Sequence, residues 1–252
     1  MNERLLVLVR AIPEKRKKGS YVVCVAGITD KGEWRRIYPF EFQPFFKKPN
    51  FRKRQWIDVQ VELPRKDKRT ESRKLIKLNS IGSTENEIGT AKKLEKHLSS
   101  SINELQTKGL SLGAIKPKPD TLDLEIKINN TKLLDEQTYF SAWQKQGIQV
   151  REKVKMPVEI SYVFQCPGEC FCKNKPHKLR IIDWEINELI RNVVKSTQNK
   201  KEIESELRQK LIDFMKKREL YFILGTHFKF KTWMIIGLIY PSKESALQTT
   251  LF

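Results

Sequence analysis

Short apolar runs separated by turn residues dominate the first 85 residues of the chain. Runs of this length, bounded by Gly, Pro, Asn and Asp, are typical of β-strands. The Asp-Lys-Gly sequence at 30–32 predicts a turn between the second and third runs. Five such strands favour a small barrel or a curled sheet, for which OB-like and PUA-like barrels are templates by analogy only. The expected strands are residues 5–12, 21–28, 34–38, 56–63 and 75–81.

From about residue 86 the spacing of the apolar positions changes. Leu94, Leu98, Ile102 and Leu105 recur at helical intervals, and Gly109 is a typical helix stop. Two nearly continuous apolar runs near the end predict a buried C-terminal hairpin. The other expected elements are a short helix at 134–146, helices that bury 186–194 and 203–215, strands at 122–126, 158–164 and 179–182, and the hairpin strands 221–224 and 233–240.

These patterns predict the α+β fold class. The expected organisation is a basic, strand-rich region at residues 1–85 that binds nucleic acid, followed by a mixed α/β region at 86–252 that holds a Cys/His loop. The two regions can also pack together as one domain.

Charge adds a functional argument to this picture. The chain carries 49 Lys and Arg residues against 30 Asp and Glu, a formal net charge of +19, and residues 1–80 hold +12 of it. Such an excess opposes compaction by self-repulsion, and a polyanion is its usual partner. A Lys-rich surface that only confers solubility is the alternative, although acidic residues normally balance such a surface. Membrane-surface binding is disfavoured, because no expected helix pairs a basic face with a Trp/Phe/Leu face.

The positive charge of the first region falls mainly in the connections between its expected strands. Cationic loops can follow a phosphate backbone, and neighbouring aromatic rings can stack on bases. Phe45, Phe46 and Phe51 alternate with such cations, and the alternative is that these rings belong to the core. The residues expected to contact nucleic acid are Lys15, Arg16, Lys17, Lys18, Arg35, Arg36, Lys47, Lys48, Arg52, Lys53, Arg54, Lys66, Lys68 and Arg69.

Three cysteines and a histidine lie within twelve residues, in the spacing C-x3-C-x-C-x4-H. Zn²⁺ takes four such ligands in a tetrahedron, and a Pro-Gly pair lets the loop bend around the ion. The spacing matches none of the common zinc-finger patterns, so free cysteines near a strand end are the alternative. The ligands of the expected structural Zn²⁺ are Cys166, Cys170, Cys172 and His177.

Asp183 and Glu185 follow an expected strand and begin an expected helix. Carboxylates at a strand end could hold Mg²⁺ for phosphodiester hydrolysis, with His177 or His227 as the base. An Asp at the N-cap and a Glu in the first turn are also what a helix start favours. A metal-dependent nuclease with Asp183, Glu185 and His227 as catalytic residues is therefore an alternative hypothesis.

The leading hypothesis is a nucleic-acid-binding protein that works alone or as an accessory subunit of a nucleoprotein complex. A third hypothesis is an interaction subunit for an acidic protein partner. No apolar run approaches the roughly 20 residues of a membrane span, and the N-terminus lacks a signal-peptide pattern. Four cysteines, three of them clustered, do not form a disulfide framework, so we expect a reducing, cytoplasmic compartment.

Overall fold

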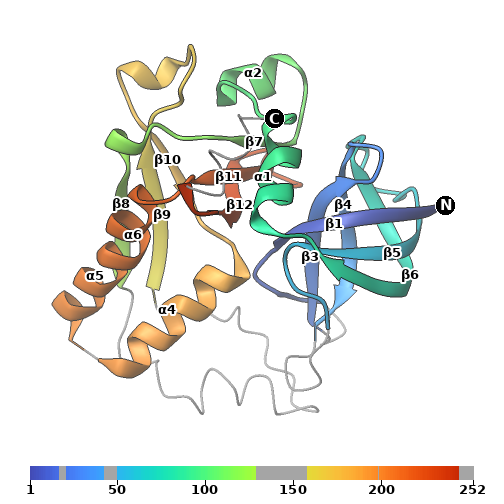
Figure 1. Cartoon of the computed structure of the whole chain (residues 1–252), viewed down its shortest axis with the longest axis horizontal. Coiled ribbons are helices and arrows are strands. Elements are labelled where there is room, and N and C mark those ends of the chain that lie inside the picture. Colours follow the sequence, from blue (N-terminus) through green and yellow to red (C-terminus); the bar gives the residue numbers. More distant parts are fainter. Residues whose placement is uncertain (17–20, 43–49, 129–157, 198, 244–252) are drawn as a thin grey trace.

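The computed structural model describes residues 1–16, 21–42, 50–128, 158–197 and 199–243. The chain is mixed α/β and strand-rich, with few helices among the described residues. Figure 1 shows a barrel at one side, a three-stranded sheet with helices at the other, and a second three-stranded sheet between them.

The N-terminal region is a closed five-stranded barrel, which confirms the expected small barrel. Its strands follow the order β1-β5-β6-β4-β3, and pairing of β1 with β3 closes the ring. The β4–β6 pair is parallel, and the other pairs are antiparallel. A two-residue strand, β2 (Glu14–Lys15), extends the edge of β3. The barrel strands are β1 (Asn2–Arg10), β3 (Tyr21–Thr29), β4 (Trp34–Glu41), β5 (Gln55–Glu62) and β6 (Ser72–Thr84).

Apolar side chains from alternate positions of the strands fill the interior of this barrel. Leu5 and Val7 of β1 and Val23 and Val25 of β3 are buried there with residues of β4 and β5. Closure of β1 on β3 depends on Gly27, because a Cβ atom at this position would lie 1.8 Å from the carbonyl oxygen of Leu6. The interior of the barrel is therefore a packed core, and only the loops and the outer surface that the second region leaves uncovered remain for binding.

Two three-stranded antiparallel sheets form most of the second region, in the orders β10-β9-β8 and β12-β11-β7. The expected hairpin is β11–β12, and β11 is the central strand of its sheet. The third strand, β7, was not expected, since its four residues are too few to give a pattern. The strands are β7 (Leu112–Ile115), β8 (Asp123–Ile128), β9 (Val158–Phe164), β10 (His177–Arg180), β11 (Tyr221–Thr226) and β12 (Trp233–Ile239).

Helices cover one face of the β8–β9–β10 sheet (Figure 1). Tyr162 of β9 donates a hydrogen bond of 2.7 Å to the carbonyl of Leu211, which ties the sheet to the helical layer. No described helix has the length and apolar character needed to cross a membrane. The helices are α4 (Trp184–Ser196), α5 (Lys200–Arg208), a π-helical turn (Gln209–Asp213) and α6 (Phe214–Lys216).

The single helix expected from Leu94 to Leu105 is wrong. Two helices, α1 (Glu87–Glu95) and α2 (Ile102–Thr107), stand in its place. Between them Leu98 pairs with Ala114 of β7, and the Ser101 side chain caps α2. A serine in this position favours a helix start over a helix interior, which explains the break. The helix expected at 134–146 lies outside the described residues.

The outer face of β1 and β3 packs against the β7–β11–β12 sheet. Leu6 and Ile28 of the barrel share an apolar cluster with Tyr221 and Ile236 of that sheet. A Cβ atom at Gly237 of β12 would lie 2.8 Å from a methyl group of Val9 and 3.1 Å from the carbonyl oxygen of Leu8. This close approach joins the two regions through a continuous core.

Candidate functional site

The Cys/His cluster sits where β9 and β10 meet. These strands pair antiparallel, and the register sets His177 opposite Phe164. Cys166 lies two residues after the end of β9. Because His177 pairs with Phe164, the loop between the strands brings His177 back close to Cys166. Cys170 and Cys172 lie within that loop, on either side of the exposed Phe171. The antiparallel pairing is therefore what brings the four side chains together.

The ligand atoms of Cys166, Cys170, Cys172 and His177 all lie within 4.8 Å of one another. The Sγ of Cys170 is 3.0 Å from Nε2 of His177, and the four cysteines of the chain are free thiols. In a tetrahedral zinc site with ordinary bond lengths, the ligand atoms stand about 3.5–3.8 Å apart. The cluster thus fits a metal ion such as zinc with small side-chain adjustments.

The surroundings shift the pKa values of three of these four side chains, and the directions differ. Burial lowers the pKa of His177, which keeps the imidazole neutral and free to coordinate. Burial also raises the pKa of the Cys166 thiol. For Cys170, burial is outweighed by hydrogen bonds from Cys172 and other neighbours, and its pKa is lowered. A bound cation would deprotonate the remaining thiols.

A second layer of residues fixes the cluster loop. The backbone N–H of Cys166 donates to Sγ of Cys172 at 3.3 Å, and the Cys170 thiol donates to Oδ1 of Asn103 on α2 at 3.3 Å. Gly168 donates its N–H to the carbonyl of Ser100 at 2.9 Å. The three cysteines belong to the core cluster of the second region. The site therefore joins the β9–β10 loop to the segment that leads into α2.

The carboxylate of Asp183 is held inside the protein by several donors. Oδ1 accepts the N–H of Glu185 at 2.9 Å, which caps α4 as expected from the sequence. Oδ2 accepts the N–H of Leu238 at 2.7 Å and forms a buried ion pair with Lys53. Asp183 is 1 % exposed and Lys53 is 7 % exposed. Glu185 also lies 3.4 Å from the Lys53 ammonium group.

The histidines of the nuclease hypothesis lie away from this carboxylate. His177 belongs to the cysteine cluster. His227 bonds to Thr232 just before β12, whereas Asp183 bonds to Leu238 near its other end. Leu238 is five residue steps along the strand from Trp233, which corresponds to about 17 Å. The structure therefore does not bring His227 and Asp183 together.

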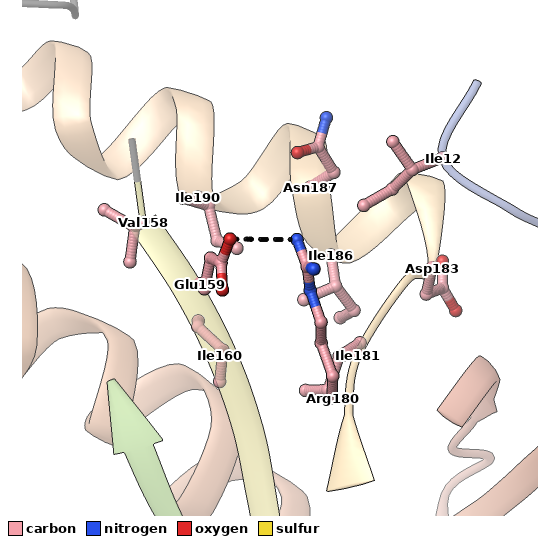
Figure 2. A pocket seen from close by; sticks show the side chains of 10 residues that line it. All are labelled: Ile12, Val158, Glu159, Ile160, Arg180, Ile181, Asp183, Ile186, Asn187 and Ile190. Carbon is pink, nitrogen blue, oxygen red and sulfur yellow. Dashed lines mark ion pairs between the residues drawn. The ribbon is translucent and has the colours of Figure 1, made fainter. Parts of the chain in front are cut away.

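Asp183 also lines a narrow pocket between β9, β10 and α4 (Figure 2). Most of its lining is isoleucine and valine, and its polar side chains include the Arg180–Glu159 ion pair of 3.2 Å. The hollow has room for little more than a water molecule. It is too small and too apolar to hold a nucleotide.

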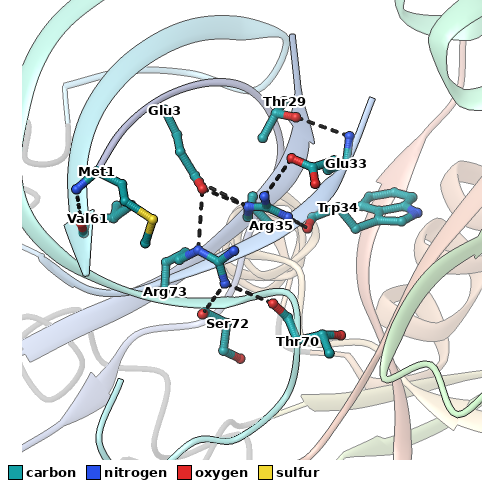
Figure 3. A network of polar contacts seen from close by, with 10 residues as sticks. All are labelled: Met1, Glu3, Thr29, Glu33, Trp34, Arg35, Val61, Thr70, Ser72 and Arg73. Carbon is teal, nitrogen blue, oxygen red and sulfur yellow. Dashed lines mark hydrogen bonds and ion pairs between the residues drawn. The ribbon is translucent and has the colours of Figure 1, made fainter. Parts of the chain in front are cut away.

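Several of the cations expected to contact nucleic acid are engaged in internal contacts. Arg35 donates to Glu3 at 2.9 Å and to Glu33 at 2.6 Å, and Arg73 contacts the same Glu3 carboxylate at 3.3 Å (Figure 3). Arg36 is buried and donates to the carbonyl of Ser111 at 2.9 Å. These arginines stabilise the barrel and its contact with the second region.

The loops divide the remaining cations into paired and unpaired groups. Arg54 lies 3.6 Å from Glu87, and Arg69 pairs with Asp67 at 2.5 Å. A second group of cations is exposed and forms no ion pair with a described carboxylate. Its members are Arg16, Arg52, Arg65, Lys66 and Lys68. Lys17, Lys18, Lys47 and Lys48 lie outside the described residues, as do Phe45, Phe46 and the side chain of Lys15.

The sequence reasoning missed two exposed aromatic residues in the turn between β11 and β12. Phe228 is 48 % exposed and Phe230 is 74 % exposed, and Lys229 lies between them. The signal in the sequence was the alternation of Phe and Lys in a turn after a buried strand. Alternation of this kind normally predicts a strand with one apolar face, so it did not mark the rings as exposed.

Comparisons with known proteins give two family matches. A family model described as "Domain of unknown function (DUF8758)" matches residues 1–102, and one described as "Domain of unknown function (DUF8757)" matches residues 88–252. No curated protein matches the chain. The domain boundary expected near residue 85 stays a prediction. Because the second model covers more than half of the chain, the protein belongs to the family Domain of unknown function (DUF8757).

Proposed function

We propose that this protein binds nucleic acid through phosphate contacts from the exposed cations on its barrel loops. The observation that carries the proposal is the group of exposed cations without a described carboxylate partner, set against a net charge of +19. An unpaired cation on a loop is free to neutralise a phosphate, whereas a buried pair such as Lys53–Asp183 is not.

The positions of these cations suit an extended polyanion. Arg16 and Arg52 lie in the connections at one end of the barrel strands, and Lys66 and Lys68 lie in the β5–β6 loop at the other end. Tyr38 is exposed on β4, between the two ends. A strand of eight residues, such as β4, is about 26 Å long. One strand of duplex presents about seven phosphates over that distance.

The barrel architecture is consistent with this use. We interpret the closed five-stranded barrel as OB-like, a class in which the loops after the first and fourth strands flank a nucleic-acid-binding face. The corresponding connections here are the segment between β1 and β3 and the β5–β6 loop, and both carry unpaired cations. The likeness in architecture is an analogy, and the unpaired cations carry the proposal.

We further propose that the Cys/His cluster holds a structural Zn²⁺. Four protein ligands would complete the tetrahedron and leave no open position for a substrate. The ion would then fix the β9–β10 loop and not take part in chemistry. We expect about one Zn²⁺ per chain by elemental analysis, lost in the Cys170→Ser/Cys172→Ser variant and kept in the Cys24→Ser control.

A binding titration against single- and double-stranded DNA and RNA tests the main proposal. If about four phosphates are neutralised, affinity should fall roughly 100-fold between 50 and 200 mM salt. The Lys66→Gln/Lys68→Gln variant should reduce the slope of log K against log salt by about 2. Lys200→Gln/Lys201→Gln removes the same charge from the exposed start of α5, away from the barrel, and should change the slope little.

Other outcomes separate the alternative functions. Mg²⁺-dependent shortening of the substrate would favour the nuclease hypothesis. No binding to any of the four nucleic acids would overturn the proposal and favour an acidic protein partner. Equal loss of affinity in the two double-lysine variants would show that net charge alone, and not the barrel loops, drives binding.

A further inference from the structure

The turn between β11 and β12, residues 227–232, presents aromatic rings on an ordered backbone. The ring of His227 stacks on that of Phe230, with centroids 4.9 Å apart and planes inclined by 21°. Nδ1 of His227 accepts the backbone N–H groups of Lys229 at 3.2 Å and Phe230 at 3.3 Å. The turn is closed by a bond of 2.8 Å from the N–H of His227 to the carbonyl of Thr232. The exposed rings therefore lie on a turn that its own hydrogen bonds hold in place.

This turn is fastened to the β5–β6 loop of the barrel. Arg69 donates to the carbonyl of Thr226 at 2.8 Å, and its guanidinium group lies 5.7 Å from the centre of the Phe228 ring. Asp67 holds Arg69 from the other side, at 2.5 Å. Arg69 and Thr226, the last residue of β11, are 157 residues apart in sequence, so the contacts of Arg69 with Thr226 and Phe228 join two distant segments at one surface.

The charge of this joint surface is positive. Lys229 and Lys231 are exposed in the turn, and Lys66 and Lys68 are exposed in the loop. No described carboxylate forms an ion pair with any of these four. The nearest acid of the loop, Asp67, is occupied by Arg69 and by the hydroxyl of Ser72 at 2.9 Å. Exposed rings thus stand among cations that remain available to phosphate.

We propose that residues 227–232 and the β5–β6 loop form a stacking platform for unpaired bases of a single-stranded nucleic acid. Bases in a duplex are already stacked on one another, so they have no free face on which an exposed phenylalanine ring could stack. Unpaired bases can stack on a phenylalanine whatever their sequence, while nearby cations follow the backbone. This inference rests on the proposed nucleic-acid binding and names its ligand class.

The test compares one exposed ring with another. Phe230→Ala removes a ring of the platform that is 74 % exposed, and Phe171→Ala removes a phenylalanine of the cysteine loop that is 88 % exposed. Affinity for a 20-nucleotide oligo(dT) and for a 20-base-pair duplex is measured by fluorescence anisotropy. We expect Phe230→Ala to weaken oligo(dT) binding by about tenfold and duplex binding by less than twofold, and Phe171→Ala to change neither. Unfolding midpoints verify that both variants fold.

Ultraviolet crosslinking to oligo(dT), followed by mass spectrometry, gives a second readout. We expect the crosslink on the peptide that contains Phe228 and Phe230. Unchanged oligo(dT) affinity in Phe230→Ala, with weakened binding to both ligands in Lys66→Gln/Lys68→Gln, would overturn the platform and leave the proposed function standing. Absence of all nucleic-acid binding in the wild type would overturn both. Binding only to phosphatidylserine vesicles, weakened by Phe230→Ala, would instead assign this surface to membranes.

Discussion

The buried pair of Lys53 and Asp183 allows a sharp test of how the two regions are joined. Lys53→Met keeps the length of the side chain but removes the ammonium group. The buried Asp183 carboxylate would then lose its cationic partner and keep only the N–H groups of Glu185 and Leu238 as donors. Breaking a buried pair in this way destabilises a protein by about 3–5 kcal/mol. An exposed control, Lys200→Met, should stay within about 0.5 kcal/mol of the wild type.

A double-mutant cycle isolates the interaction between the two charges. Asp183→Asn keeps a good helix cap but leaves the Lys53 ammonium buried, with the half-exposed Glu185 at 3.4 Å and the carbonyl of Leu238 at 3.3 Å as its partners. Lys53→Met/Asp183→Asn removes both charges. The destabilisation of the double variant should therefore be smaller than the sum of the two single destabilisations, by at least about 1.5 kcal/mol. Urea unfolding followed by circular dichroism gives these free energies, provided that the m values stay constant.

The pH dependence gives an independent check on the same pair. Burial lowers the pKa of Lys53, but the carboxylates of Asp183 and Glu185 outweigh it and raise the pKa above its ordinary value of 10.5. The pair therefore stabilises the fold fully below pH 10.5 and is lost as the pH rises through the higher folded-state pKa. Lys53→Met should lack this alkaline loss. A destabilisation by Lys53→Met below about 1 kcal/mol, or additive effects in the cycle, would mean that the pair does not hold the two regions together.

Three further predictions concern the cysteine loop, α2 and the barrel. Gly168→Ala would place a Cβ atom 2.6 Å from Cβ of Ser100 and 3.1 Å from its carbonyl oxygen, so thermal unfolding should show a loss of about 1–3 kcal/mol. Hydrogen bonds from Lys108 and Ser100 lower the pKa of Glu104 from 4.5 to about 2, so this group stabilises the fold above pH 4.5 and loses that effect as the pH falls towards 2. Glu104→Gln should accordingly cost less than about 1 kcal/mol at pH 6, since the group is partly exposed, and the difference from wild type should shrink at pH 3 in urea unfolding. Burial raises the pKa of Cys24 from 9.0 to about 11, so iodoacetamide at pH 8 should label this thiol about 100-fold more slowly in the folded than in the unfolded protein, as measured by peptide mass spectrometry. Equal labelling rates would mean that the outer face of β3 is open to solvent.

Local patterns predicted much of the fold, because they depend on residues close together in the chain. Period-two alternation located β9, and the Asp183 cap located the start of α4. The expected helix from Leu94 to Leu105 failed, because helical spacing alone does not show that Leu98 pairs with β7. The two helices of the structure each begin at a capping residue, Asn86 and Ser101, and these two residues are the local signal for the break.

The candidate metal site was predictable for the same reason. Its four ligands lie within twelve residues, and a single antiparallel pair of strands suffices to close the loop that carries them. Sequence spacing therefore set an upper limit on the distances between the thiols and the imidazole. The residues that support the site, Asn103 and Ser100, come from a distant segment and carried no local signal.

Most of the strand and helix segments, the excess of positive charge and the compact Cys/His cluster followed from the sequence alone. Only the tertiary structure decided which cations are available. Arg52 and Lys53 are neighbours with the same charge, yet Arg52 is exposed and Lys53 is buried against Asp183, 130 residues further along the chain. The same holds for Arg69, which meets the β11–β12 turn 157 residues away. The physical reason is that composition fixes the sum of the charges, while their pairing depends on contacts between distant segments that form only when the chain folds.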